Sequence, residues 1–266
     1  MFSKTAPSQI LALRARIAQL ERGGAKAERG IVPIGLPAVD AVLADGGLAL
    51  GALHEAMGGG PDTEHAAAAT LFAATILTRL DGPILWVLRQ ADLFAPSLAN
   101  VGLSLNRILF VEAGRDVLAA MEEGLRHHGL AAVVGEVMGR MTLVASRRLR
   151  LAAEQSGALA IAIRRSQAFD DPVLLEPSAA VTRWRVTALP SPAGMTSMLE
   201  PARWRLDLIR DRDGKSGSWT MEEADATGCL RLVAQTGDGQ ADSGQADDGR
   251  DQGRRLAAAS AGRRRA

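Results

Sequence analysis

Residues 54–77, HEAMGGGPDTEHAAAATLFAATIL, have the layout of a phosphate-binding turn. Three consecutive glycines, Gly58, Gly59 and Gly60, follow a short apolar stretch and precede a long apolar helical pattern. A phosphate loop of the form G-x-x-x-x-G-K-S/T lies between a strand and a helix, because its backbone N–H groups cradle phosphates, its lysine neutralises them and its hydroxyl holds Mg²⁺. The sequence therefore has the shape of a nucleotide site.

The chemical groups of that motif are replaced in this chain. Counting from the first of the three glycines assigns the second motif glycine, the lysine and the metal-binding hydroxyl to Thr63, Glu64 and His65. A carboxylate such as that of Asp62 or Glu64, 4 Å from a phosphate oxygen, costs about 4 kcal/mol per charge pair at an effective dielectric constant of 20. A helix N-terminus offsets at most about 2 kcal/mol of this. We therefore expect the turn to repel a triphosphate, and we predict no cofactor.

A phosphate-loop ATPase also needs an acidic residue at the end of a later strand, to hold Mg²⁺ and water. The best candidate follows the apolar run LAAVV, where Gly135 comes first and Glu136 is displaced by one residue. Because side chains alternate along a strand, this displacement is expected to point the Glu136 carboxylate away from the site. No histidine has the H-x-x-x-H spacing of a metal site, and no serine lies in a G-x-S-x-G turn. We predict neither a metal site nor a serine hydrolase.

Alternating apolar runs and helical patterns must position the glycine turn. Strands are predicted at 52–57, 84–88, 108–111, 130–134 and 158–163, and helices near 64–80, 92–101, 115–128 and 141–156. Runs such as LAAVV and ALAIAI suit strands that are buried on both faces, and their alternation with helices requires a parallel sheet with crossover connections. The sequence predicts an α/β domain with a mostly parallel sheet flanked by helices.

After residue 180 the pattern changes to a period of two, which is typical of strands with one buried face. The segments RWRVTAL and RWRLDLI place five apolar side chains inward, namely Trp184, Val186, Trp204, Leu206 and Leu208. The alternate positions are expected to face outward, namely Arg183, Arg185, Arg203, Arg205 and Asp207. Further strands near 217–221 and 228–233 complete a predicted antiparallel β meander.

The two ends of the chain differ from this core. The first 29 residues contain one apolar helical stripe, formed by Ile10, Leu13, Ile17 and Leu20, which predicts an amphipathic helix. Docking of this stripe on a partner and packing on its own domain both stay open. Residues 236–266 contain almost no large apolar side chain, which predicts a disordered tail, and they end in a basic cluster of Arg263, Arg264 and Arg265. We predict three units: helix and linker 1–29, core 30–235, and tail 236–266.

The composition excludes several classes of protein. With 266 residues, 47% hydrophobic residues and a net charge of +1, the chain is expected to be globular, without a global field toward nucleic acid or membrane. One cysteine excludes an intrachain disulfide and is typical of a cytoplasmic protein. Arginines interrupt the first apolar positions, so no signal peptide is expected, and the most apolar run, 66–78, is too short to span a bilayer.

The order of these segments resembles the ImuA family, RecA-like proteins of the bacterial SOS mutagenesis cassette. The resemblance covers about residues 30–234 and is carried by IGLPAVDAVLADGGLALGALHEAMGGGPDTEH, ILWVLRQADLF, LAAVVGEV, SGALAIAIRR and RWRLDLIRDRDGKSGSW. It implies a RecA-like core. In RecA, a glutamate after the strand that matches ILWVL activates the attacking water, whereas this chain has Gln90, which cannot take a proton. The altered positions together predict a protein that is not an enzyme.

The resemblance also implies a role in damage-induced translesion DNA synthesis. The implied partners are a Y-family-like protein of the ImuB type and an error-prone replicative-type DNA polymerase, with RecA and DNA as further candidates. RecA carries DNA on two loops that correspond here to 135–140 and 164–172. Arginines beside an aromatic side chain could contact phosphates and stack a base, and Arg164, Arg165 and Phe169 are the candidates in the second loop. The alternative for this loop is a solvated loop without a binding role. For the basic end of the tail, two interpretations stay open: it captures DNA or a partner, or it only keeps the protein soluble.

Two other functions stay open on the sequence alone. One is a RecA-like ATP-binding protein that is completed in trans, with Arg115 or Lys26 as candidate groups. The other is a cell-division inhibitor that resembles the SulA family, which shares a damaged RecA-like core but is typically shorter. The length beyond residue 200 favours the mutagenesis protein.

Overall fold

The computed structural model describes residues 30–168, 171–190, 202–212, 215–222 and 227–236. Several predicted features lie outside these residues and stay predictions. They are the N-terminal helix with its stripe Ile10, Leu13, Ile17 and Leu20, the aromatic Phe169, and the tail with Arg263, Arg264 and Arg265.

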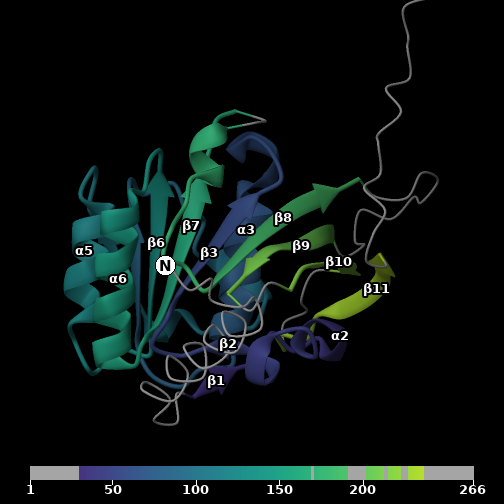
Figure 1. Ribbon diagram of the computed structural model, residues 1–266, viewed down its shortest axis with the longest axis horizontal. Helices are drawn as coiled ribbons and strands as arrows, with labels where there is room; N and C mark the ends of the chain where they lie inside the picture. Colours follow the sequence, from purple (N-terminus) through teal and green to yellow (C-terminus); the bar gives the residue numbers. More distant parts are fainter. Residues whose placement is uncertain (1–29, 169–170, 191–201, 213–214, 223–226, 237–266) are drawn as a thin grey trace, which may run out of the picture.

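A mixed sheet forms the centre of the part of the chain that the structure describes (Figure 1), with nine strands in the order β11-β10-β9-β8-β3-β7-β6-β4-β5. The strands from β8 through β3, β7, β6 and β4 to β5 pair in parallel, and β8 to β11 form an antiparallel meander. The predicted fold class is confirmed. The bounds are β3 Leu53–Gly58, β4 Ile84–Leu88, β5 Ile108–Glu112, β6 Ala132–Met138, β7 Leu159–Arg165, β8 Thr182–Leu189, β9 Arg203–Asp211, β10 Gly217–Glu222 and β11 Arg231–Thr236.

Helices cover both faces of this sheet (Figure 1). One face, here called the α3 face, carries α3 (Asp62–Leu77) and α4 (Pro96–Asn100). The other, here called the α6 face, carries α5 (Val117–Leu125) and α6 (Leu143–Ser156). Short elements that the sequence did not predict are β1 Ile31–Val32, β2 Leu48–Ala49, α2 Pro37–Asp40, and the 3-10 turns Ala44–Gly46, Leu105–Arg107 and Pro172–Leu175.

The ends of α3 and α6 follow from their sequences. Helix α3 begins directly after Pro61, and its first turn contains two acidic residues, which the positive end of the helix dipole favours. Helix α6 begins after Thr142, whose side chain accepts a hydrogen bond from the N–H of Ala145. It ends at Gly157, where φ is 80°, a conformation that glycine adopts without strain.

Strands β6 and β7 run further than predicted. β6 continues to Met138 instead of ending at residue 134, and β7 continues to Arg165. The two strands stay paired to their ends, with Met138 opposite Arg165. The expectation that loops begin at Gly135 and Arg164 is therefore wrong. Charged residues are accepted inside these strands because other side chains neutralise them, as described below.

The meander buries its apolar face as predicted. Trp184, Trp204 and Trp219 are almost fully buried, and the rings of Trp184 and Trp219 lie 6.4 Å apart between centroids. The predicted outward face is wrong at one position, because Arg183 is only 5% exposed. The chain just before β8 covers this side chain, since Glu176 O accepts a hydrogen bond from Arg183 Nη2 at 2.8 Å.

Candidate functional site

The glycine turn joins β3 to α3, as predicted, but its backbone donors are used within the protein. The N–H of Gly59 donates to Val186 O at 3.0 Å, and the N–H of Asp62 donates to Ser166 O at 2.8 Å. A Cβ atom on Gly59 would lie 2.1 Å from Thr187 Oγ1, so the turn packs directly on β8. Two of the amides that a phosphate loop would offer to a ligand are therefore occupied.

The side chains at the three altered motif positions do not converge on the turn. His65 is 8% exposed, and its Nδ1 accepts a hydrogen bond from the N–H of Ala188 at 3.2 Å. The Glu64 side chain is 58% exposed and lies 3.8 Å from the His65 ring, and Thr63 is exposed. Of the two carboxylates expected to repel a phosphate, Asp62 and Glu64, only that of Asp62 is held inside the site, with its side chain 16% exposed.

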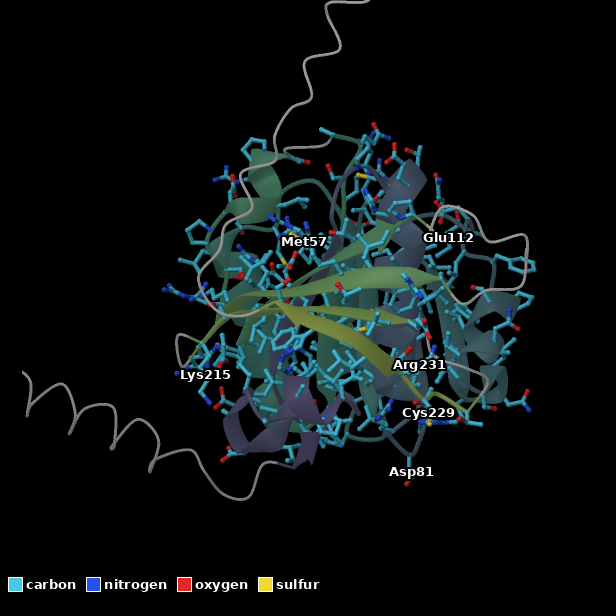
Figure 2. The ribbon with its side chains drawn as sticks, turned by 90° about the vertical axis from the view of Figure 1, so that its right-hand side faces the viewer. Met57, Asp81, Glu112, Lys215, Cys229 and Arg231 are labelled. Atoms are coloured by element: carbon cyan, nitrogen blue, oxygen red, sulfur yellow. The ribbon has the colours of Figure 1, made fainter. Side chains whose placement is uncertain are left out.

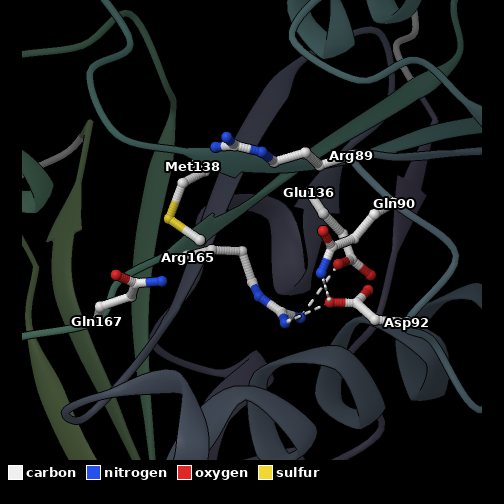
Figure 3. Close-up of a pocket in the computed structure, with 7 residues that line it drawn as sticks. All are labelled: Arg89, Gln90, Asp92, Glu136, Met138, Arg165 and Gln167. Atoms are coloured by element: carbon white, nitrogen blue, oxygen red, sulfur yellow. Dashed lines mark hydrogen bonds and ion pairs between the residues drawn. The ribbon is translucent and has the colours of Figure 1, made fainter.

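Arg165 links three parts of the chain around the turn through carboxylates, and Figure 3 shows two of them, Glu136 and Asp92. Its Nε lies 3.0 Å from Asp62 Oδ2, at the start of α3, and its Nη1 lies 3.1 Å from Glu136 Oε2, in β6. Its Nη2 lies 3.7 Å from Asp92 Oδ2, in the segment after β4. The other oxygen of Asp62, Oδ1, accepts a hydrogen bond from the N–H of Ser166 at 3.1 Å. One guanidinium with its planar set of donors thus joins α3, β6 and the segment after β4.

A pocket of about 300 Å³ surrounds this guanidinium (Figure 3). It lies at the carboxyl ends of the parallel strands, where open α/β sheets form their ligand sites. Gln90 lies in its wall, where the resemblance placed it, and donates a hydrogen bond to Asp92 at 3.2 Å. The lining residues are Arg89, Gln90, Asp92, Glu136, Met138, Arg165 and Gln167.

Glu136 faces this pocket, so the expectation that its carboxylate points away is wrong. Because β6 continues beyond Val134 and side chains alternate along a strand, Glu136 lies on the same α3 face as Val134, two residues before it. The Glu136 side chain is 4% exposed. Its Oε1 accepts a hydrogen bond from Trp86 Nε1 at 3.2 Å. Burial raises the pKa of the Glu136 carboxyl above its usual value, and Arg165 and the Trp86 hydrogen bond oppose that rise. The Glu136 carboxylate is positioned where it could bind a metal ion or a water, but it already pairs with the Arg165 guanidinium.

A second ion cluster lies on the α6 face of the same strands. Glu55, in the middle of β3, is completely buried, and its Oε2 lies 2.9 Å from Arg183 Nε and 3.7 Å from Arg164 Nη1. Arg164 is 1% exposed and donates from Nη2 to Gly139 O at 2.9 Å. Burial lowers the pKa of the Arg164 guanidinium, and Glu55 opposes this. A buried carboxylate thus holds two buried guanidinia.

Arg164 and Arg165 are neighbours in β7 and point to opposite faces, each toward carboxylates of neighbouring strands. The structure therefore does not present these two candidate DNA contacts on an open loop. Arg164 is buried, and the Arg165 side chain is 17% exposed and engaged in ion pairs. The sequence did contain a signal for this arrangement, because Glu55 and Glu136 are carboxylates within strands that are otherwise apolar. Such carboxylates require buried cations nearby.

Two further properties of the described residues bear on function. No group of three histidine, cysteine, aspartate or glutamate side chains in the described ranges is arranged to hold a metal ion. No helix among them combines the length and the apolar character that crossing a membrane requires.

Comparison with known proteins adds two relatives and one structure. The chain is 34% identical over 229 residues to Protein ImuA of Caulobacter vibrioides strain NA1000 / CB15N, which covers 81% of this chain and 93% of that protein. The same values hold for Protein ImuA of strain CB 15. The crystal structure of the RadB recombinase matches with a TM-score of 0.55 and 16% identity, over 77% of this chain and 100% of that chain, which shows the RecA-like fold alone. No family model matches the chain.

Proposed function

Because this chain belongs to the ImuA family, we propose that it is a non-catalytic RecA-fold adaptor in SOS-induced mutagenesis. In this proposal it acts in error-prone translesion DNA synthesis, where it bridges a Y-family-like protein of the ImuB type and an error-prone replicative-type polymerase. The single observation that best supports the non-catalytic part is the set of ion pairs made by Arg165. Its guanidinium binds the three carboxylates at the carboxyl ends of the strands.

The charges around the pocket support the absence of nucleotide turnover. Three carboxylates, those of Asp62, Asp92 and Glu136, pair with the Arg165 guanidinium, and a second guanidinium, that of Arg89, lines the pocket. A triphosphate would bring further negative charge, and it would have to replace short pairs between ions that are mostly removed from water. Such exchange is unfavourable, because each charge left without its partner at low exposure costs several kcal/mol, on the order of 3 to 5.

The motif also lacks the groups that would compensate for this cost. No lysine stands in the turn, and Glu64 at the lysine position points to solvent. Gln90 can hydrogen-bond a water but cannot remove its proton. What remains is a rigid sheet whose two ion clusters tie β3, β6, β7 and β8 together, and this is the mechanical property that a scaffold needs.

We expect the purified full chain to release no phosphate from ATP and Mg²⁺ above a protein-free control. The variant Glu64→Lys, which returns the motif lysine, is expected to stay inactive, because Asp62 and Arg165 still fill the site. Phosphate release and binding of a fluorescent ATP analogue are the measurements, each with and without the ImuB-type partner.

Each outcome of that experiment has a meaning. Saturable ATP binding by the chain alone would overturn the proposal. Binding that needs the partner would instead favour the ATP-binding protein completed in trans, which the orientation of Glu136 into the pocket keeps as the second candidate.

The bridging role predicts that the N-terminal stripe contacts a partner. Replacing Ile10 and Ile17 together by aspartate should weaken capture of the ImuB-type protein at least tenfold, because charges would enter an apolar contact. The matched control places aspartate at Ala12 and Gln19, on the opposite side of the same helical pattern. Capture is scored by pull-down from damaged cells, together with the polymerase and the division protein FtsZ. Equal capture by both double variants would remove the stripe from the interface, and recovery of FtsZ alone would favour the division inhibitor.

A further inference from the structure

A groove lined by arginines lies at the opposite end of the sheet from the glycine turn. Two arginines come from α6, Arg147 and Arg150. Of the other two, Arg210 lies near the end of β9 and Arg212 directly follows that strand. The groove encloses about 190 Å³, and its floor is the segment 179–181, which leads into β8. This segment pairs with the amino end of β3, since the N–H of Val181 donates to Leu53 O, whereas the glycine turn follows the carboxyl end of that strand.

The four guanidinia are only partly neutralised by the protein. Arg147 and Arg212 make no side-chain hydrogen bond or ion pair with any residue in the described part of the chain, and both are exposed. Arg210 donates from Nη1 to the carbonyl oxygen of Ser178 at 3.2 Å, which carries no charge. Arg150 is paired with a carboxylate, since its Nη1 lies 3.6 Å from Glu154 Oε2. The groove therefore concentrates positive charge although the whole chain is nearly neutral.

Asp213, next to Arg212 in the sequence, lies outside the described residues. Two acidic residues near the groove that the structure does describe do not cancel its charge. Asp211 lies between two of the arginines but is 6% exposed, and its pairing with Thr182 places it on the other face of the strand. Glu122, on the neighbouring helix α5, is already bound by Arg148 at 2.6 Å and by Arg126 at 2.7 Å. Like charges at short distance repel each other, so a ligand with several negative charges would relieve an unfavourable interaction of the folded state.

The chemistry of the groove favours phosphates. The forked donors of a guanidinium match the oxygens of a phosphate, and the small side chains Ala179 and Ala180 in the floor leave room for close approach. None of the described residues that line the groove is aromatic, so we expect no stacking of bases there. We propose that this groove binds the phosphate backbone of a nucleic acid without reading its sequence.

A nucleic acid suits four separate arginines better than an acidic peptide does. It offers a charge at every nucleotide, so any register of the strand satisfies the groove. A peptide would need several carboxylates at matched spacing. This choice of ligand also rests on the proposed function, whereas the positive charge of the groove does not.

The surface next to the groove extends the same charge. Lys215 is exposed and follows Arg212 by three residues, so their Cα atoms lie within about 11 Å of each other. Figure 2 shows Lys215 and Glu112 on opposite sides of the molecule. The exposed Arg115, three residues after Glu112, is therefore a suitable control on a different surface.

Binding of the full chain to a fluorescent 20-nucleotide oligothymidine and to a 20-base-pair duplex, measured by anisotropy over a range of salt, tests this proposal. Four phosphate contacts predict that log K falls with log salt with a slope of about −3 for the single strand. The variant Arg147→Ala with Arg212→Ala should weaken binding about tenfold at 50 mM salt and reduce the magnitude of the slope by about 1 to 2. Arg115→Ala with Arg205→Ala removes the same charge elsewhere and should change both values much less.

Several results would overturn the proposal. The first is that neither nucleic acid binds. The second is that the groove variant and the control variant lose the same binding affinity. The third is that the groove variant loses no affinity, which would mean that another surface binds the nucleic acid. Binding of polyglutamate that depends on Arg147 and Arg212, with no binding of nucleic acid, would assign the groove to an acidic protein instead. The thermal unfolding midpoint checks that both variants fold. None of these results bears on the adaptor role, which the ATP and pull-down experiments test separately.

Discussion

Replacing Glu55 by alanine is expected to lower the free energy of unfolding by about 3 to 5 kcal/mol. The carboxylate is completely buried and is the group that faces both Arg164 and Arg183. Without it, two guanidinia with side-chain exposures of 1% and 6% would stay next to each other away from water. Urea unfolding of the full chain measures the loss.

Two variants place limits on this interpretation. Glu123→Ala removes a carboxylate that is 66% exposed and pairs with Arg126, and it should change stability by less than about 0.5 kcal/mol. Glu55→Gln keeps an oxygen that can accept the hydrogen bond of Arg183 Nε and should lose less than Glu55→Ala. A loss below 1 kcal/mol for Glu55→Ala would show that the two arginines find other partners.

Replacing Arg165 by leucine is expected to cost about 3 kcal/mol of stability at pH 7. It leaves three carboxylates facing one another, of which Glu136 is 4% exposed and Asp62 is 16% exposed. Asp92 is 41% exposed and contributes less, because water screens its charge. Urea unfolding at pH 7 measures the loss, and Arg126→Leu is the matched control, since that exposed arginine also binds two carboxylates.

The pH dependence of this loss separates charge from packing. Burial raises the pKa of Glu136 and Arg165 opposes the rise, so removing Arg165 should raise that pKa further. The folded variant then holds a proton on Glu136 at a pH where the unfolded chain, with a pKa of 4.5, has lost it. Stability from this group therefore increases as the pH falls toward 4.5. The difference between wild type and Arg165→Leu should shrink between pH 7 and pH 5, and a constant difference would mean that lost packing causes the effect.

The core of the sheet could be predicted from the sequence because its signal is local. Continuous apolar runs mark β4 at its observed bounds and the other parallel strands near their centres, and period-two alternation marks the meander. Strand ends were harder, because the pattern stops at Val134 whereas β6 runs on to Met138. The last residues of β6 are in the strand because they pair with β7, and this pairing cannot be predicted from a local sequence pattern.

The candidate site was predictable in position but not in its contacts. The glycine turn lies where the sequence placed it and Gln90 lines the pocket, whereas Glu136 also lines it although its carboxylate was expected to point away. The partners of the arginines could not be predicted, since Glu55 and Arg183 are 128 residues apart and Asp62 and Arg165 are 103 apart. Which of two adjacent arginines meets which carboxylate depends on strand order, and strand order follows from the whole fold.

The ion pairs of Arg165 also affect which substitutions at this site the protein can tolerate. A lysine at position 64 is expected to bring no benefit while Asp62 and Arg165 remain paired, and loss of Arg165 alone is expected to weaken the fold. Under the proposed function, neither of these two single substitutions is thus expected to bring a gain. If the proposed non-catalytic function holds, the ion pairs of Arg165 are therefore expected to hinder a return to nucleotide turnover through single substitutions.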